Sequence, residues 1–132
     1  MVRKLTIGRS AGVPPAGSAA SRRRAENEMG ISTHILDTAQ GKPAAGVAVT
    51  LEIDRGGYSV IASGVTNDDG RLKLVEDPPE PATYRITFDT GAYDPNGFFP
   101  RVTIEFAVRG GAQHYHVPLL LSPYGYSTYR GS

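Results

Sequence analysis

The three histidines of the sequence are the side chains best suited to acid–base chemistry near neutral pH, because imidazole gains and loses a proton in that range. His34 lies in the segment ISTHILDT, and His114 and His116 form a His-x-His pattern in HYHVPLLL. An imidazole can remove a proton from water during hydrolysis. Three imidazoles can also bind zinc, and a strand histidine is often only a surface or hydrogen-bonded core residue. The sequence alone leaves these alternatives open.

Arg71 and Arg130 offer the positive charge that hydrolysis of a carbonyl compound needs. A guanidinium is a planar fork for carboxylates, carbonyls or anionic heterocycles, and it stabilises charge on a carbonyl oxygen. Arg71 follows the turn sequence NDDG, and each arginine could instead simply point into water. The Gly-x-Ser-x-Gly match GRSAG at residues 8–12 lies in the Gly-, Pro- and Arg-rich first part of the chain and not at a turn from a strand to a helix, so no Ser-His-Asp triad is predicted. Arg130 belongs to the terminal tetrapeptide Tyr129, Arg130, Gly131 and Ser132.

The elements that must position these residues are β-strands, because apolar residues alternate with polar ones throughout the patterned region. Gly-, Pro- and Asn-rich turns separate the strands, for example at residues 40–43, 67–70 and 94–97. About eight strands at short, regular spacing predict an all-β, two-sheet sandwich with at most one short helix. The expected strands are residues 31–38, 46–54, 58–66, 71–74, 84–89, 101–109, 114–121 and 125–132.

The strand at residues 114–121 has two distinct faces. Tyr115, Val117, Leu119 and Leu121 form an apolar face that we expect in the core. The opposite face carries both histidines and a proline that cannot donate to a β-ladder. We therefore expect this second face to lie in solvent or under another subunit.

Composition narrows the function classes. A chain of 132 residues is one domain, and the absence of cysteine excludes disulfides and thiolate chemistry while fitting a reducing cytoplasm. Residues 1–28 hold six basic and two acidic residues among Gly, Pro, Ala and Ser, so we expect a disordered basic arm before a folded domain at residues 29–132. That domain is mildly acidic, which argues against nucleic acid as a partner, and no apolar stretch is long enough to span a membrane.

Three segments together resemble a known family. ISTHILDTAQGKPAAGVAVTLE, TNDDGRLKL and HYHVPLLLSPYGYSTYRGS are similar to the transthyretin-like 5-hydroxyisourate hydrolases of purine degradation. The first two segments also occur broadly in prealbumin-like modules, whereas the terminal YRGS marks the hydrolase branch. The resemblance runs from about residue 31 to the end of the chain.

The resemblance implies a function and a site. The implied reaction is hydrolysis of a ring amide of 5-hydroxyisourate to 2-oxo-4-hydroxy-4-carboxy-5-ureidoimidazoline, without a cofactor or metal. The implied catalytic residues are His34, Arg71 and His116, which would lie at the dimer–dimer interface of a homotetramer. Which histidine is the base, and what His114 does, stay open. The implied substrate-binding residues are Tyr129, Arg130, Gly131 and Ser132.

Two other functions compete with the hydrolase. A transthyretin-like carrier of a small aromatic ligand would share the sandwich but would not need the histidines, Arg71 and YRGS together. A structural module of a surface protein would predict tandem domains and a secretion signal, and the sequence shows neither. One departure from the family is the segment DTGAYDPNGFFP, which looks short and puts a helix of the family's length there in doubt.

Overall fold

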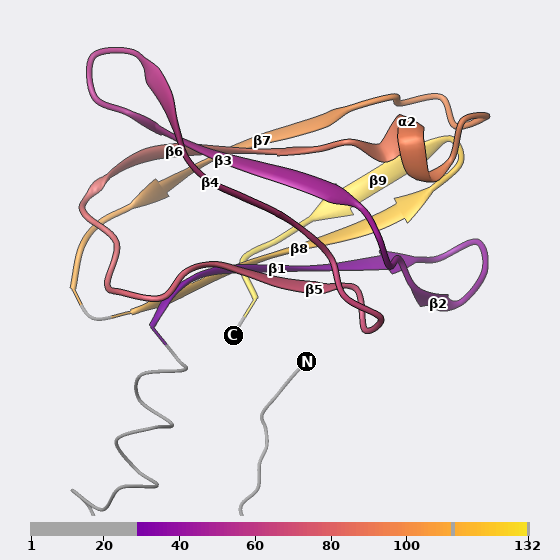
Figure 1. Cartoon of the computed structure of the whole chain (residues 1–132), viewed down its shortest axis with the longest axis horizontal. Coiled ribbons are helices and arrows are strands. Elements are labelled where there is room, and N and C mark those ends of the chain that lie inside the picture. The colour runs from indigo at the N-terminus through magenta and orange to yellow at the C-terminus, as the bar shows by residue number, and fades with distance from the viewer. Residues whose placement is uncertain (1–28, 112, 132) are drawn as a thin grey trace, which may run out of the picture.

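Two β-sheets dominate the computed structural model, which describes residues 29–111 and 113–131. Figure 1 shows them as two layers, with β3, β6 and β7 above β1, β5 and β8. The predicted two-sheet β-sandwich is therefore confirmed, whereas the expected arm at residues 1–28 lies outside the described residues. One sheet has the order β2 (Lys42–Pro43), β1 (Gly30–Asp37), β8 (His114–Ser122) and β9 (Gly125–Thr128), with β5 (Arg71–Val75) also paired to β1. The other has the order β4 (Tyr58–Val65), β3 (Ala48–Asp54), β6 (Ala82–Phe88) and β7 (Val102–Val108).

The structure differs from the predicted elements at three places. The two-residue strand β2 lies inside the predicted turn at residues 40–43, because Lys42 and Pro43 pair with the end of β1. The single helical turn of the described residues is α2 (Thr90–Tyr93), within the connection that looked short. The last strand, β9, ends at Thr128 rather than at the end of the chain.

The core forms where the apolar faces of the two sheets meet. Alternate residues of each strand point inward, as the period of two predicts. Each large apolar side chain buried in this way contributes roughly 1.5–3 kcal/mol to folding stability. The most completely buried apolar residues are Tyr84, Phe88, Ile31, Ile35, Leu51, Ile53, Ile86, Leu119, Val47, Val49 and Val102.

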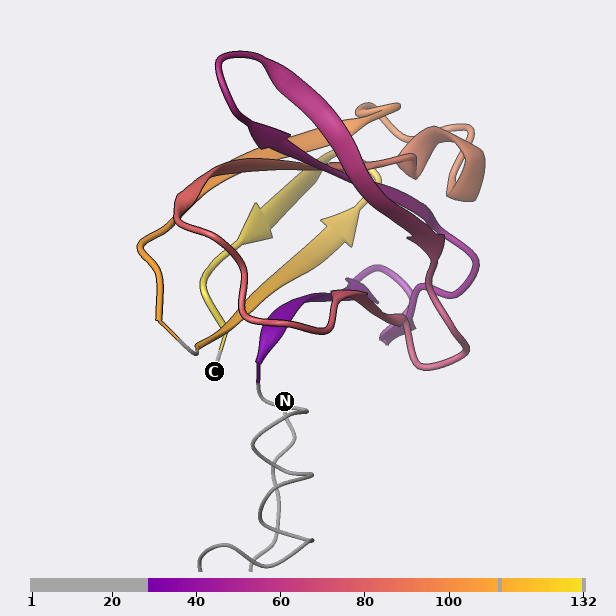
Figure 2. The same ribbon diagram turned by 60° about the vertical axis from the view of Figure 1, so that its left-hand side comes forward.

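Strand β1 is the element that organises the functional residues, because it lies between β8 and β5. It runs parallel to β8, with Ser32 beside His116, and antiparallel to β5, with His34 opposite Arg71 and Ser32 opposite Lys73. Residues directly opposite one another on neighbouring strands share a face of the sheet. The sheet therefore gathers histidines and cations on its outer face, while Figure 2 shows the other sheet covering its inner face.

Candidate active site

His34 and Arg71 lie side by side because a tight turn places β5 against β1. Asn67 Oδ1 accepts the backbone N–H of Arg71 at 3.0 Å, which closes the turn. Gly70 has a φ of +74°, and a Cβ there would collide with the carbonyl oxygen of Ile35. The Ile35 N–H also donates to the Gly70 carbonyl at 2.8 Å, so the turn is joined directly to β1. Only glycine combines this φ with this close approach.

The surroundings of His34 favour its neutral form. Burial and the neighbouring Arg71 guanidinium lower the pKa of His34 below its ordinary value of 6.5, while a hydrogen bond to the Asp69 backbone carbonyl acts in the opposite direction. Each effect has the expected sign, because low polarity and a like charge both disfavour the imidazolium. A neutral imidazole beside a guanidinium can hold a water molecule next to a carbonyl group that the arginine polarises.

His116 lies on β8, on the same outer face, and it is more buried than the sequence predicted. Its exposed fraction is 7%, and Pro118 beside it is also buried. We expected solvent or another subunit over this face, but at these two residues the chain's own C-terminal tail provides cover. The inward face of β8 follows the prediction, since Tyr115, Val117, Leu119 and Leu121 are all in the core.

The tail reaches His116 because strand β9 cannot continue past Thr128. Pro118 has no N–H to offer, and its carbonyl oxygen accepts the Thr128 hydroxyl at 2.7 Å, where the β8–β9 ladder stops. Pairing resumes at Gly131, whose N–H donates to the His116 carbonyl at 2.8 Å. The predicted strand over residues 125–132 is therefore interrupted, and the interruption leaves Tyr129 and Arg130 outside the ladder.

Tyr129 and Arg130 face the opening between β7 and the β8–β9 hairpin rather than His34 and Arg71. The Arg130 guanidinium lies 4.5 Å from the centre of the Tyr115 ring and donates to Gln113 Oε1 at 3.0 Å. Tyr129 is 54% exposed. Of the predicted substrate-binding residues, Gly131 lies against the ring of His116, and Ser132 lies outside the described part of the chain.

Two residues of the outer face were not predicted as functional. Ser32 contacts both histidines of β8, with its Oγ 2.7 Å from His114 Nε2 and 2.8 Å from His116 Nδ1. Lys73 lies opposite Ser32 and adds a second cation near Arg71. Ser32 lies two residues before His34, and Lys73 lies two residues after Arg71. Because alternate strand residues share a face, this spacing could have indicated from the sequence that both lie beside the predicted site.

The described residues contain no group of three His, Asp or Glu side chains placed to hold a metal ion. The zinc alternative therefore has no ligand set in residues 29–111 and 113–131.

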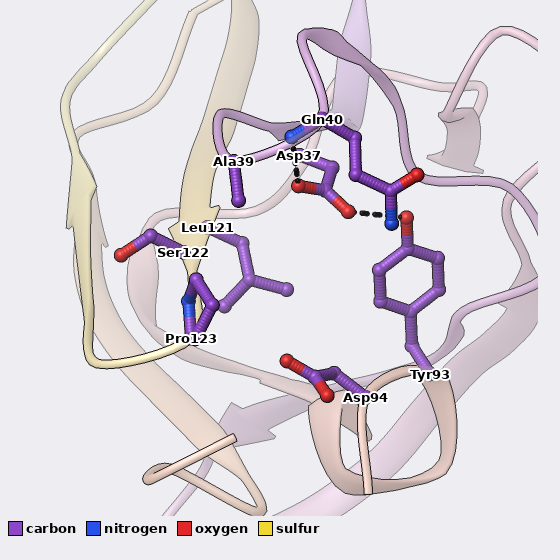
Figure 3. A pocket seen from close by; sticks show the side chains of 8 residues that line it. All are labelled: Asp37, Ala39, Gln40, Tyr93, Asp94, Leu121, Ser122 and Pro123. Atoms are coloured by element: carbon purple, nitrogen blue, oxygen red, sulfur yellow. Dashed lines mark hydrogen bonds between the residues drawn. The ribbon is translucent and has the colours of Figure 1, made fainter. Parts of the chain in front are cut away.

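A second, smaller hollow of about 130 Å³ lies at the far end of β1. Figure 3 shows Asp37 there, reached by the Tyr93 hydroxyl at 2.7 Å and the Gln40 N–H at 3.0 Å. Burial alone would raise the pKa of Asp37, but these hydrogen bonds, together with one from the Ala39 backbone and the charge of Lys42, outweigh burial and lower it. Burial and the bond to Asp37 raise the pKa of Tyr93 to about 12. These contacts attach α2 to β1, so this hollow has a structural role.

Fold and site together define a class of protein: a transthyretin-like β-sandwich with imidazoles and a guanidinium on the outer face of one sheet. The chain belongs to the HIUase/Transthyretin family, whose model matches residues 31–131.

The named relatives of this chain include both 5-hydroxyisourate hydrolases and transthyretins. A 5-hydroxyisourate hydrolase of Salmonella dublin is 48% identical over 109 residues, which cover 77% of this chain and 80% of the relative. The solved 5-hydroxyisourate hydrolase of Klebsiella pneumoniae has a TM-score of 0.69 and 38% identity, covering 77% of this chain and 98% of that chain. Sea bream transthyretin in complex with thyroxine has a TM-score of 0.70 and 34% identity, covering 76% of this chain and 93% of that chain.

Proposed function

We propose that this chain hydrolyses 5-hydroxyisourate to 2-oxo-4-hydroxy-4-carboxy-5-ureidoimidazoline, a step of urate degradation. The observation that carries the proposal is the position of His34 opposite Arg71, on the same face of the sheet as His116. Named relatives support it, since 5-hydroxyisourate hydrolases are 44–48% identical to the chain. A uric acid degradation bifunctional protein of Arabidopsis thaliana is 44% identical over 119 residues, although the match covers only 37% of that relative.

The reaction needs a water nucleophile and stabilisation of charge on the attacked carbonyl oxygen. His34 and His116 position and activate the water, which attacks a ring amide carbonyl. Arg71 binds the substrate and stabilises the negative charge that develops on the carbonyl oxygen. The breaking C–N bond then gives a ring nitrogen that takes up a proton. No step requires a cofactor.

The C-terminal tail supplies the rest of the substrate site in this proposal. Ser132 hydrogen-bonds or encloses the heterocycle, and Gly131 sets the path of the tail over His116. Tyr129 and Arg130 face the opening beside β7, so in this proposal they enclose substrate only where another copy of the chain meets that opening. The Gly131–His116 backbone contact supports this assignment, because it brings the tail onto a catalytic histidine.

The competing function is a carrier for a small aromatic ligand, as in the sea bream transthyretin complex with thyroxine. The fold does not separate the two, because the TM-scores to the hydrolase and to that transthyretin are 0.69 and 0.70. The test is to follow freshly generated 5-hydroxyisourate by its ultraviolet absorbance with and without protein, and to titrate thyroxine in parallel. Decay faster than the spontaneous rate supports the hydrolase; spontaneous decay with tight thyroxine binding supports the carrier.

We also propose a homotetramer, a dimer of dimers, acting in the cytoplasm. The edges of the two sheets, β7 and β9, flank a shared opening of about 290 Å³ lined by Ile104, Phe106 and Tyr129. Open strand edges beside exposed aromatic side chains favour pairing with another copy. Within residues 29–111 and 113–131, no helix has the length and apolar character to cross a membrane. Light scattering after size exclusion tests the tetramer, and cell fractionation tests the location.

A further inference from the structure

The C-terminal tail stays attached to the edge of β8 after strand β9 ends at Thr128. The His116 carbonyl accepts the Gly131 N–H at 2.8 Å. Two residues earlier on β8, the His114 carbonyl accepts Nη2 of Arg130 at the longer distance of 3.4 Å. Alternate carbonyls of a strand point to the same edge, so both contacts lie along one edge of β8. A backbone N–H and a side chain of the tail therefore take over where the β8–β9 ladder stops.

Arg130 makes three contacts with one guanidinium. Its Nη2 donates to Gln113 Oε1 at 3.0 Å as well as to the His114 carbonyl. Its central carbon lies 4.5 Å from the centre of the Tyr115 ring, within the range of a cation–π contact. A guanidinium suits this place, because it is planar, stacks on aromatic rings and donates several hydrogen bonds in a fixed geometry.

The groups that contact Arg130 are themselves fixed. Tyr115 is buried in the core, and its hydroxyl accepts the Arg109 backbone N–H at 3.3 Å. The Gln113 amide is oriented by a second hydrogen bond, because its Nε2 donates to the Gly110 carbonyl at 3.3 Å and its Oε1 is turned to Arg130. The end of the chain is therefore tied to the connection between β7 and β8.

The Arg130 guanidinium lies on the opposite side of β8 from the imidazoles. Tyr115 belongs to the core-facing residues of β8, whereas His114 and His116 alternate with it on the outer face. Because Arg130 stacks on Tyr115, its charge is turned toward the opening beside β7 and away from the face that carries His34. Within one chain, Arg130 thus acts on the tail rather than on a substrate held at that face.

We propose that Arg130 is a latch for the C-terminal tail: by joining Gln113 and the Tyr115 ring, it holds Gly131 against His116. This inference rests on the proposed hydrolase function and goes beyond it by giving Arg130 a role within its own chain, separate from any contact with substrate. Arg130 is then a positioning residue, because it acts through the tail residues that follow it. Without the latch, the Gly131–His116 contact has to hold against the free motion of a chain end.

The first test measures the tail in the absence of substrate, by ¹⁵N relaxation of the full chain. The Gly131 amide of the wild type should show the order of a folded backbone. Arg130→Gln and Gln113→Ala should each give Gly131 the fast motion of a free chain end, because each removes the same hydrogen bond. Arg101→Gln is the matched control, since Arg101 is exposed in the loop before β7. A Gly131 amide that is mobile in the wild type, or equally ordered in all four proteins, would overturn the latch.

The second test is steady-state kinetics on 5-hydroxyisourate. Arg130→Gln and Gln113→Ala should each lower kcat/KM by about fivefold or more, because both loosen the tail beside His116. The double variant should be no slower than the slower single variant, since the two substitutions remove one contact. Single losses that multiply in the double variant, or a Gln113→Ala variant with wild-type kcat/KM, would contradict the proposal.

Gln113→Glu separates a latch from a substrate contact. Glutamate keeps an acceptor for Arg130 and makes the hydrogen bond charge-assisted. The latch is then preserved, so kcat and KM should stay within about twofold of wild type. The bond to the Gly110 carbonyl is lost in both Gln113 variants, so their difference reports on the acceptor for Arg130. A raised KM in Gln113→Glu would mean that the carboxylate neutralises a charge that binds substrate, and the latch would be wrong.

Each variant is also compared with the wild type by thermal unfolding and size exclusion, because Arg130 faces the opening at which we propose that another copy binds. If Arg130→Gln changed the assembly while Gln113→Ala did not, Arg130 would act at that interface and not as a latch. The relaxation result is independent of turnover. A tail that is ordered in the wild type and loosened in both variants, without hydrolysis by the wild type, would therefore count against the proposed function and not against the latch.

Discussion

Gly131 packs against the His116 ring so closely that no side chain fits between them. A Cβ on Gly131 would lie 2.6 Å from Cδ2 of His116 and 3.2 Å from Cγ of Pro118. The Gly131 N–H also donates to the His116 carbonyl oxygen at 2.8 Å. Gly131 is thus held against a residue of the proposed active site.

Gly131→Ala should therefore lower activity by about tenfold or more while changing stability little, since the exposed tail can move away from the ring. The measurement is kcat/KM for 5-hydroxyisourate together with thermal unfolding. Gly125→Ala is the matched control, because the nearest atom to its added Cβ is Ser122 Oγ at an ordinary 3.7 Å. Equal rates in the two variants would mean that the contact has no part in catalysis.

Removal of residues 129–132 should cost activity far more than stability. The core strands end before this segment, and Tyr129 is 54% exposed, so little apolar burial is lost. Assay and urea unfolding of the shortened chain give the two quantities. Normal turnover by the shortened chain would remove the tail from the proposed site.

Arg71→Gln should raise the pKa of His34 toward 6.5 without fully restoring it, because burial, the larger cause of the depressed pKa, remains. Because the pKa of His34 is lower in the folded chain than in the unfolded chain, neutral His34 contributes to stability above about pH 6.5. This contribution is lost as the pH falls from about 6.5 through the folded pKa of His34. The variant should therefore lose less stability in that window. A ¹H–¹⁵N titration of His34 measures the shift, with Arg101→Gln in an exposed loop as control. An unchanged His34 pKa would contradict the proximity of the two charges.

Tyr93→Phe should destabilise the fold by about 1–3 kcal/mol at neutral pH, because it leaves a buried carboxylate without one hydrogen bond. The lowered pKa of Asp37 means that its stabilising contribution is present above the unfolded value of 3.8 and is lost as pH falls through the folded value. The difference between variant and wild type should therefore shrink in acid. Urea unfolding at several pH values checks this, with Tyr124→Phe as control, since Tyr124 is 81% exposed. An equal loss at all pH values would argue against the Asp37–Tyr93 contact.

Strand alternation made the sandwich predictable. The inward faces of β1, β3, β6 and β8 follow directly from apolar residues at every second position, and these residues form the core. The position of Arg71 was predictable only through the resemblance, because sequence spacing does not say which strand lies opposite β1. The register that sets His34 against Arg71 is a property of the sheet.

The tail shows what strand patterns alone could not reveal. The alternating pattern predicted that the last strand runs to the end of the chain. Pro118 lacks the backbone N–H that the β8–β9 ladder would need at that position, so the ladder stops at Thr128. The Ser32 contacts were likewise hidden, because they join residues 82 and 84 positions apart in the sequence. The Ser32 contacts depend on the parallel pairing of β1 with β8, whereas the course of the tail depends on the antiparallel pairing of β8 with β9.

The central claim is tested most directly by the decay rate of 5-hydroxyisourate with wild-type protein, Arg71→Ala and His116→Ala at equal concentration. The wild type should accelerate decay well above the spontaneous rate. Each variant should lower kcat/KM at least tenfold, about 1.4 kcal/mol or more of transition-state stabilisation, while remaining folded. Decay at the spontaneous rate with wild-type protein, or wild-type rates in both variants, would contradict the account.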